Sequence, residues 1–169
     1  MEKLTHLNEK GDVKMVDVSE KTPSAREARA SATLLASPGL IRLIQEQALP
    51  KGDALTTAKI AGIQAAKRTH ELIPMCHPLR LSQVGVEITL EEDRFRITST
   101  VRAHDRTGVE MEALTAASVA ALTLYDMCKS ADNLGVPFVA IGCMYRTGYF
   151  EQVLDMDGSQ HHIYRAHDF

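Results

Sequence analysis

The sequence predicts an α+β fold, in which helices cover one face of a mostly antiparallel sheet. The first indication is a hairpin: residues 81–90 and 95–101 both alternate apolar with polar side chains, and the polar turn Glu91-Glu92-Asp93 separates them. The second is that helical patterns stand before and after this hairpin instead of alternating with single strands. Segregated helices and strands are typical of two-layer α+β sandwiches.

The remaining elements follow from local signals. A strand is expected over 27–35, and Val13–Val18 is either a short strand or an ordered arm. A helix begins at Ser37-Pro38, because Ser is a good N-cap and Pro suits the first helical position. A second helix is expected over 54–72 and a long one over 110–131. The long helix is apolar on nearly all sides and should therefore be buried, either in the core or between subunits. Further strands are expected over 136–141 and 149–154.

Length and composition predict a single domain over 1–169, with 1–14 as a mobile arm and 151–169 as a tail of uncertain structure. No apolar run approaches the roughly 18 residues of a membrane span, and 1–14 lacks the apolar centre of a signal peptide. We therefore expect a cytoplasmic protein. The net charge of -3 gives no reason to expect a nucleic-acid or membrane partner. The three cysteines form no CxxC pair, so no structural metal site is expected.

A proline-bracketed loop, Pro74 to Pro78, presents Met75, Cys76 and His77. The two prolines restrict the backbone on both sides, as a positioned site requires. His77 can act as acid, base or hydrogen-bond donor near neutral pH. The competing interpretation, at even odds, is a buried loop with an inert thiol, and a Cys-His nucleophilic pair ranks below both.

The long helix carries charged residues near both of its ends. Glu110 and Glu112 lie in its first turn, where complementing the helix dipole is the more common role, and Met111 is more often a packing residue. Asp126 and Lys129 share a face near its end; a surface ion pair is the usual explanation, although apolar neighbours favour a poorly hydrated, proton-transferring pair. Glu112 and Asp126 are separated by roughly 21 Å of helix. If both are functional, a site shared between subunits of a homo-oligomer is favoured.

Cations elsewhere are candidates for binding phosphate. Lys51 precedes Gly52-Asp53 at a helix start, and Lys67-Arg68 lies near the end of the second helix. Arg26 and Arg29 lie near the N-terminus. Taken singly, each is more often a solvated surface residue. Neither a Walker loop nor a GxGxxG motif is present, so side chains would have to hold any nucleotide.

Several of these motifs, in this order and spacing, resemble the cyclic pyranopterin monophosphate synthases of molybdenum-cofactor (molybdopterin) biosynthesis. The resemblance covers residues 4–130 and rests on Met15–Ser19, Lys51–Asp53, Ala61–Lys67, Cys76–Pro78 and Thr107–Lys129. It implies a ferredoxin-like α+β sandwich that assembles as a hexamer of three dimers, with the site at a dimer interface. It also implies a lyase that converts a cyclised guanosine triphosphate derivative, supplied by a radical enzyme, into cyclic pyranopterin monophosphate and pyrophosphate.

The resemblance also implies residue roles. Asp126 is the catalytic acid or base, and Lys51 and Lys129 are the catalytic lysines. Residues of the loop and of the helix start contact the substrate: Met75, Cys76, His77, Glu110, Met111 and Glu112. Arg26, Lys67 and Arg68 are candidates for the triphosphate. No cofactor is required, and Mg²⁺ is expected only as a companion of the triphosphate.

The C-terminal part departs from the family pattern. A loop of the Gly-Gly-Lys-Ser-Gly kind, whose lysine contributes to the site, is absent, and the chain reads Arg146-Thr147-Gly148 instead. Arg146 can supply a cation, but a guanidinium is a poor proton donor. Two alternatives to an active lyase therefore stay open: a binding protein without turnover, and an oligomeric assembly factor of the pathway.

Overall fold

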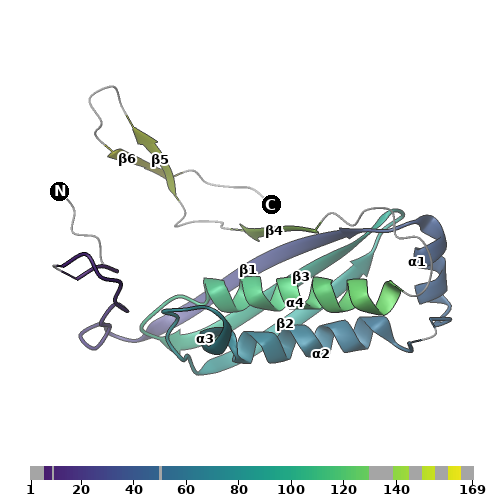
Figure 1. Cartoon of the computed structure of the whole chain (residues 1–169), viewed down its shortest axis with the longest axis horizontal. Helices are drawn as coiled ribbons and strands as arrows, with labels where there is room; N and C mark the ends of the chain where they lie inside the picture. Colours follow the sequence, from purple (N-terminus) through teal and green to yellow (C-terminus); the bar gives the residue numbers. More distant parts are fainter. Residues whose placement is uncertain are drawn as a thin grey trace.

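The computed structural model describes residues 6–8, 10–49, 51–129, 139–144, 150–154 and 160–164. Its body is one antiparallel sheet in the order β2-β3-β1-β4, with the two long helices on one face (Figure 1). The strands are β1 Ser24–Leu35, β2 Leu81–Leu90, β3 Arg94–Asp105 and β4 Val139–Met144. The helices are α1 Pro38–Gln45, α2 Ala54–Lys67, α3 Thr69–Leu72 and α4 Glu110–Cys128. This confirms the predicted α+β, ferredoxin-like class. A separate antiparallel pair, β5 Phe150–Leu154 and β6 Gln160–Tyr164, lies outside this sheet.

The sheet is held together by long registers. β1 pairs antiparallel with β3 along its whole length, from Ser24 opposite Asp105 to Leu35 opposite Arg94. This full pairing explains why β1 begins before residue 27 and why β3 continues past residue 101, beyond the predicted limits. Alternate residues of β1, namely Ala30, Ala32 and Leu34, are fully buried under the helices, as a sheet with one covered face requires.

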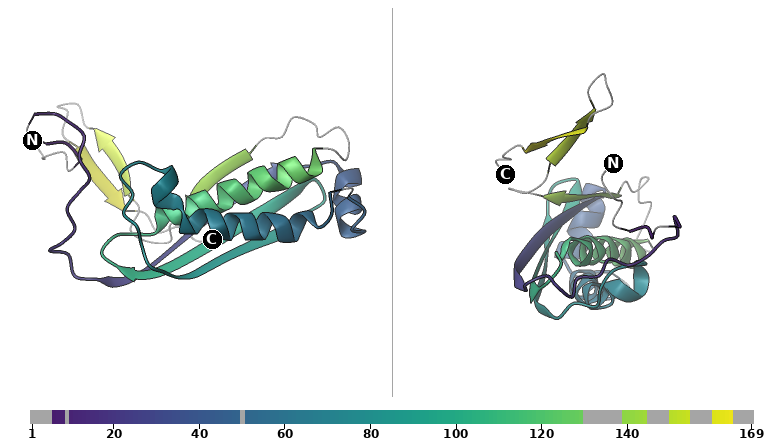
Figure 2. Two further views of the ribbon diagram at one scale, coloured as in Figure 1. Left: turned by 60° about the horizontal axis from the view of Figure 1, so that its bottom comes forward. Right: turned by 90° about the vertical axis from the view of Figure 1, so that its left-hand side faces the viewer.

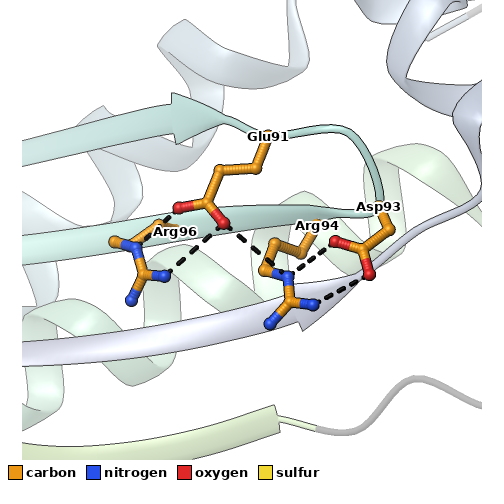
Figure 3. Close-up of polar contacts among 4 residues, drawn as sticks. All are labelled: Glu91, Asp93, Arg94 and Arg96. Atoms are coloured by element: carbon orange, nitrogen blue, oxygen red, sulfur yellow. Dashed lines mark hydrogen bonds and ion pairs between the residues drawn. The ribbon is translucent and has the colours of Figure 1, made fainter.

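The turn between β2 and β3 lies where the sequence predicts it. Arg94 Nε lies 2.6 Å from Asp93, and Arg96 Nε lies 2.7 Å from Glu91 (Figure 3). The backbone N–H of Ala36 donates to the Asp93 carbonyl at 2.9 Å, which ties the end of β1 to this turn. The side chains of these ion pairs are 35–57% exposed, so hydrogen-bonded strand pairing contributes more to the hairpin than they do.

Helices α2 and α4 lie side by side across the sheet (Figure 2). Their contact is lined by small residues, and a Cβ added to Gly62 would stand 2.7 Å from the carbonyl oxygen of Ala116. The buried side chains of α4 at this contact are also small: Ala113, Ala116, Ala117, Ala120 and Ala121. We call this contact the small-residue seam. It brings the two helix backbones close together.

Three predicted helix features need correction. The helix expected over 54–72 is broken at Arg68, which caps α2, and α3 follows; Thr69 Oγ1 donates to the Ala66 carbonyl at 3.0 Å, a local bond that competes with continued helix. Helix α4 ends at Cys128, and residues 130–131 of the predicted helix lie outside the described residues. Its predicted burial in the core does not hold on every side, because Leu122 is 59% exposed in the single chain; burial between subunits stays a prediction.

The ends of the chain can be compared only in part. Within the described part of 1–18, the strand interpretation of Val13–Val18 is wrong: Val13 makes one isolated bridge to Leu7. The strand expected over 136–141 appears as β4, and residues 136–138 lie outside the described residues. The strand expected over 149–154 appears as β5. Residues 155–159 and 165–169 of the tail also lie outside the described part.

Candidate active site

Two groups of predicted site residues lie at opposite ends of α4. The antiparallel packing of α2 against α4 fixes this arrangement, since Lys51 contacts Asp126 while Gly62 contacts Ala116 further back along the helix. The start of α4 and the Cys76-His77 loop form one group, which we call the loop end. Lys51, Asp126 and Lys129 form the other, the lysine end. Fourteen helix positions, roughly 21 Å of rise, separate Glu112 from Asp126.

The lysine end contains a direct contact between two predicted catalytic residues. Lys51 Nζ donates to the backbone carbonyl of Asp126 at 2.8 Å and lies 3.1 Å from its Oδ2. Lys51 is placed by the turn before α2: Gly52 has φ +88°, and Asp53 caps the helix by accepting from the Thr56 N–H at 3.0 Å. The two halves of this pair are therefore held by different elements, 75 positions apart in the chain.

The expected pairing of Asp126 with Lys129 needs correction. In the described part of the chain the ion-pair partner of Asp126 is Lys51. Lys129 is the C-cap of α4 and is exposed. The Asp126 side chain is 71% exposed, so in the single chain it has the hydration of a surface residue and not that of the poorly hydrated alternative. Asp126 lies on the exposed side of this last turn, whereas Leu124 and Cys128 on its other side are fully buried.

The loop end is a tight turn with a strained residue. Met75 has φ +66°, the left-handed region that non-glycine residues rarely adopt. The Cys76 N–H donates to the Ile73 carbonyl at 3.3 Å, which closes the turn. His77 Nε2 lies 2.9 Å from the carbonyl oxygen of Val16, so the N-terminal segment contacts the loop. Backbone strain of this kind is found where the surrounding structure fixes a side chain for function.

Glu112 lies in the first turn of α4 and is only 4% exposed. Burial raises the pKa of its carboxyl, and the nearby charge of Glu110 raises it further, while its own backbone N–H and His70 act in the opposite direction. Glu110 itself folds over Gly108, where an added Cβ would collide with the carboxylate. Gly108 therefore leaves room for an acidic side chain at the start of the helix.

The Cys76 thiol lies near Glu112. Burial raises the pKa of this thiol, and the negative charge of Glu112 raises it as well. A thiol whose pKa is raised is protonated at neutral pH and is a poor nucleophile. This geometry favours a contact role for Cys76 over the Cys-His nucleophilic pair.

The three candidate phosphate ligands differ in setting. Arg26 is half-buried on the helix-facing side of β1, and among the described residues its Nε is the one buried side-chain nitrogen or oxygen without a hydrogen-bond partner. Lys67 ends α2 and lines a cavity of about 360 Å³ with Ser82 and Gln83. Arg68 is exposed at the α2 cap. A second cavity, of about 390 Å³, lies beside Lys51 and is lined in part by Gly52 and Asp53.

Some functional candidates were missed by the sequence analysis. The Val16 carbonyl is a backbone group, which no side-chain pattern reveals. Asp17 lies near Arg106 and His77. Hydrogen bonds from Ser19 are the largest cause that lowers the pKa of its carboxyl, and the charge of Arg106 lowers it further. The run Met15–Ser19 among the resembling motifs was the available signal. Arg146 lies outside the described residues, as does the loop that replaces Gly-Gly-Lys-Ser-Gly.

The fold is a ferredoxin-like sandwich, and one helix carries a Lys-Asp pair at one end and a Cys-His loop at the other. The protein is therefore a small α+β protein whose charged candidate site is split between two places. Among known protein families, the family model described as "MoaC family" matches residues 15–144 of this chain. This chain belongs to the MoaC family. In the part of it that the structure describes, no helix has the length and apolar character needed to cross a membrane.

Curated relatives agree with this assignment. A protein of Streptomyces griseus subsp. griseus named cyclic pyranopterin monophosphate synthase is 57% identical over 134 residues, covering 79% of this chain and 76% of the relative. One from Mycobacterium tuberculosis, named cyclic pyranopterin monophosphate synthase 1, is 56% identical over 131 residues, or 77% of each chain. One from Methylobacterium nodulans with the name cyclic pyranopterin monophosphate synthase is 52% identical over 150 residues, covering 88% of this chain and 93% of the relative.

Proposed function

We propose that this protein is a cyclic pyranopterin monophosphate synthase of molybdenum-cofactor biosynthesis. Its substrate is the cyclised guanosine triphosphate derivative, and its products are cyclic pyranopterin monophosphate and pyrophosphate, which makes it a lyase. The observation that carries the proposal is the Lys51–Asp126 contact, in a chain whose curated relatives bear that name. A cation and a carboxylate 3.1 Å apart can exchange a proton with a bound substrate.

The lysine end supplies the chemistry. Asp126 acts as acid or base while the purine-derived ring opens and is rebuilt. Lys51 and Lys129 hold positive charge where the cyclic phosphate closes. A sugar hydroxyl oxygen bonds to the first phosphorus, its proton passes to the Asp126 carboxylate, and the bond from that phosphorus to the leaving pyrophosphate breaks. Positive charge stabilises the oxyanions that develop in this step. Mg²⁺, if it takes part, arrives with the triphosphate.

The loop end binds the substrate. Met75, Cys76 and His77 contact it from the strained turn, and Glu110, Met111 and Glu112 from the start of α4. Arg26, Lys67 and Arg68 bind phosphate oxygens. Arg26 is the strongest of the three, because its buried Nε has no hydrogen-bond partner among the described residues and an anion would satisfy it.

The complete site is formed between two subunits of a dimer-based hexamer. The support is the roughly 21 Å of helix that separates the two ends, which one compact substrate does not span. Mixing two inactive variants tests this. If Glu112→Ala chains and Asp126→Asn chains are unfolded together and reassembled, mixed dimers contain one intact site and one doubly altered site, so about a quarter of the sites regain activity. No recovery would contradict a shared site.

A second candidate function is a binding protein without turnover, and the missing Gly-Gly-Lys-Ser-Gly loop favours it. Purified protein supplied with the cyclised triphosphate separates the two. Release of pyrophosphate and pterin product supports the lyase. Binding of the substrate without product supports the second candidate. Lys129→Ala adds a check: the lyase proposal predicts lost turnover with the oligomer intact. We also propose that the protein is located in the cytoplasm and that a radical enzyme acts before it and supplies its substrate.

A further inference from the structure

The N-terminal segment reaches the loop end through one backbone atom. We call residues 15–19 the N-terminal strap. The carbonyl oxygen of Val16 lies 2.9 Å from His77 Nε2, although the two residues are 61 positions apart. Hydrogen bonds hold the chain on both sides of this contact: Lys14 N–H donates to the His6 carbonyl, and Ser19 N–H donates to Asp17 Oδ1, each at 2.9 Å. These bonds shape the segment locally, and the contact with His77 joins it to the loop end.

A carbonyl oxygen can only accept a hydrogen bond, so the contact selects the form of imidazole that carries its proton on Nε2. A neutral imidazole has one N–H, and the other nitrogen is then an acceptor with a free lone pair. A hydrogen bond at one ring nitrogen therefore determines whether the other nitrogen of a neutral ring carries a proton. His77 is also held from its own side, because the loop is closed by the Cys76 N–H and bracketed by two prolines.

We propose that the Val16 carbonyl is a positioning group: it fixes His77 as the Nε2–H tautomer and leaves Nδ1 as the acceptor for the substrate. The matching group on the substrate is an N–H or O–H donor, so His77 receives a hydrogen bond or a proton there when its ring is neutral. This inference rests on the proposed function for the identity of the substrate, but the tautomer itself is a property of the free protein. Its test therefore needs no substrate.

The test is NMR of the full chain labelled with ¹⁵N in histidine. We expect the neutral His77 ring to show a proton coupled to Nε2 and protected from exchange with water. A chain that begins at Glu20 lacks the strap, and exchange of that proton should be at least about fivefold faster, the effect of one ordinary hydrogen bond. A chain that begins at His6 keeps Val16 and the bond from the Lys14 N–H to the His6 carbonyl, and is the matched control. A proton on Nδ1 in the full chain, or unchanged exchange without the strap, would overturn the proposal.

Two further variants keep the test valid if the shortened chain does not fold. His77→Gln places an amide nitrogen near the position of Nε2, whereas the amide nitrogen of His77→Asn corresponds to Nδ1. The carbonyl-carbon resonance of Val16 should stay close to its parent position in the first variant and move in the second. Equal Val16 shifts in the two variants would overturn the proposal. Because no turnover is measured, failure here is distinct from failure of the proposed function.

Discussion

Lys51 and Asp126 are two predicted catalytic residues that the fold brings into contact, with Nζ 3.1 Å from Oδ2 and 2.8 Å from the Asp126 carbonyl oxygen. The carbonyl contact matters because it does not depend on the charge of the carboxylate. Lys51 therefore stays near the end of α4 even when the Asp126 side chain turns toward a substrate. The carboxylate is the movable partner of the pair.

Replacing either partner should abolish most turnover while leaving the fold intact. We expect Asp126→Asn and Lys51→Met each to lower kcat by about 10²–10⁴-fold, the usual size of a lost acid–base group. Stability should change little, because the pair is exposed. Turnover and urea unfolding measure the two effects. Lys59→Met, which removes a cation from the neighbouring part of α2, is the control; unchanged turnover in Lys51→Met would remove Lys51 from the mechanism.

The buried carboxyl of Glu112 should lower the stability of the folded protein at neutral pH while it contributes to turnover. Its pKa is raised, chiefly by burial, so the folded protein holds the proton more tightly than the unfolded chain does. Stability is then highest below the ordinary glutamate value of about 4.3 and falls as pH rises from there to the raised folded value. Glu112→Gln removes this loss and should be more stable than the parent at neutral pH, with less turnover. Unfolding at acid and neutral pH tests the sign, with exposed Glu87→Gln as the charge control.

Gly62 should tolerate no side chain. Alanine favours helix by about 1 kcal/mol over glycine, but a Cβ at Gly62 would stand 2.7 Å from a backbone oxygen of α4. We expect the collision to outweigh the propensity, so that Gly62→Ala is destabilising by about 1–3 kcal/mol. Gly39→Ala in α1 is the matched control, since its nearest neighbour is 3.9 Å away, and it should be neutral or stabilising. If Gly62→Ala and Gly39→Ala were equally stable, the close packing inferred for the small-residue seam would be contradicted.

Asp53 should make the protein acid-sensitive. The pKa of its carboxyl is lowered, first by the hydrogen bonds from Thr56. A lowered pKa contributes stability that is present above the ordinary aspartate value, near pH 4, and is lost as pH falls through the folded value. Asp53→Asn also caps a helix but does not titrate. The stability difference between parent and variant should therefore shrink below about pH 4; a difference that is constant with pH would exclude this role.

The sequence predicts the elements better than their contacts. Period-two alternation and the Ser37-Pro38 cap are local signals, and they place β2 and the start of α1 correctly. The limits of β1 and β3 depend on how long two strands pair, which no local pattern contains. The break at Arg68 depends on one hydroxyl bonding back to a helix carbonyl.

The candidate site shows the same division. The residue types at both ends were predictable from motifs, and their separation followed from the helix rise. The partner of Asp126 was not predicted from the residues, since Lys51 lies on another element and only folding brings it there. Val16 was missed because its contribution is a backbone oxygen.

The small-residue seam has a consequence for any assembly of this chain. At Gly62 the two helices lie so close that an added Cβ would stand 2.7 Å from the carbonyl oxygen of Ala116, so the seam leaves no room for a side chain between them. Helix α4 therefore keeps Glu112, near one end, at a fixed distance from Asp126, near the other. If the proposed site between subunits forms, its geometry depends on how two copies meet. A substitution at that contact, far from either charge, should then lower turnover as effectively as one beside a charge.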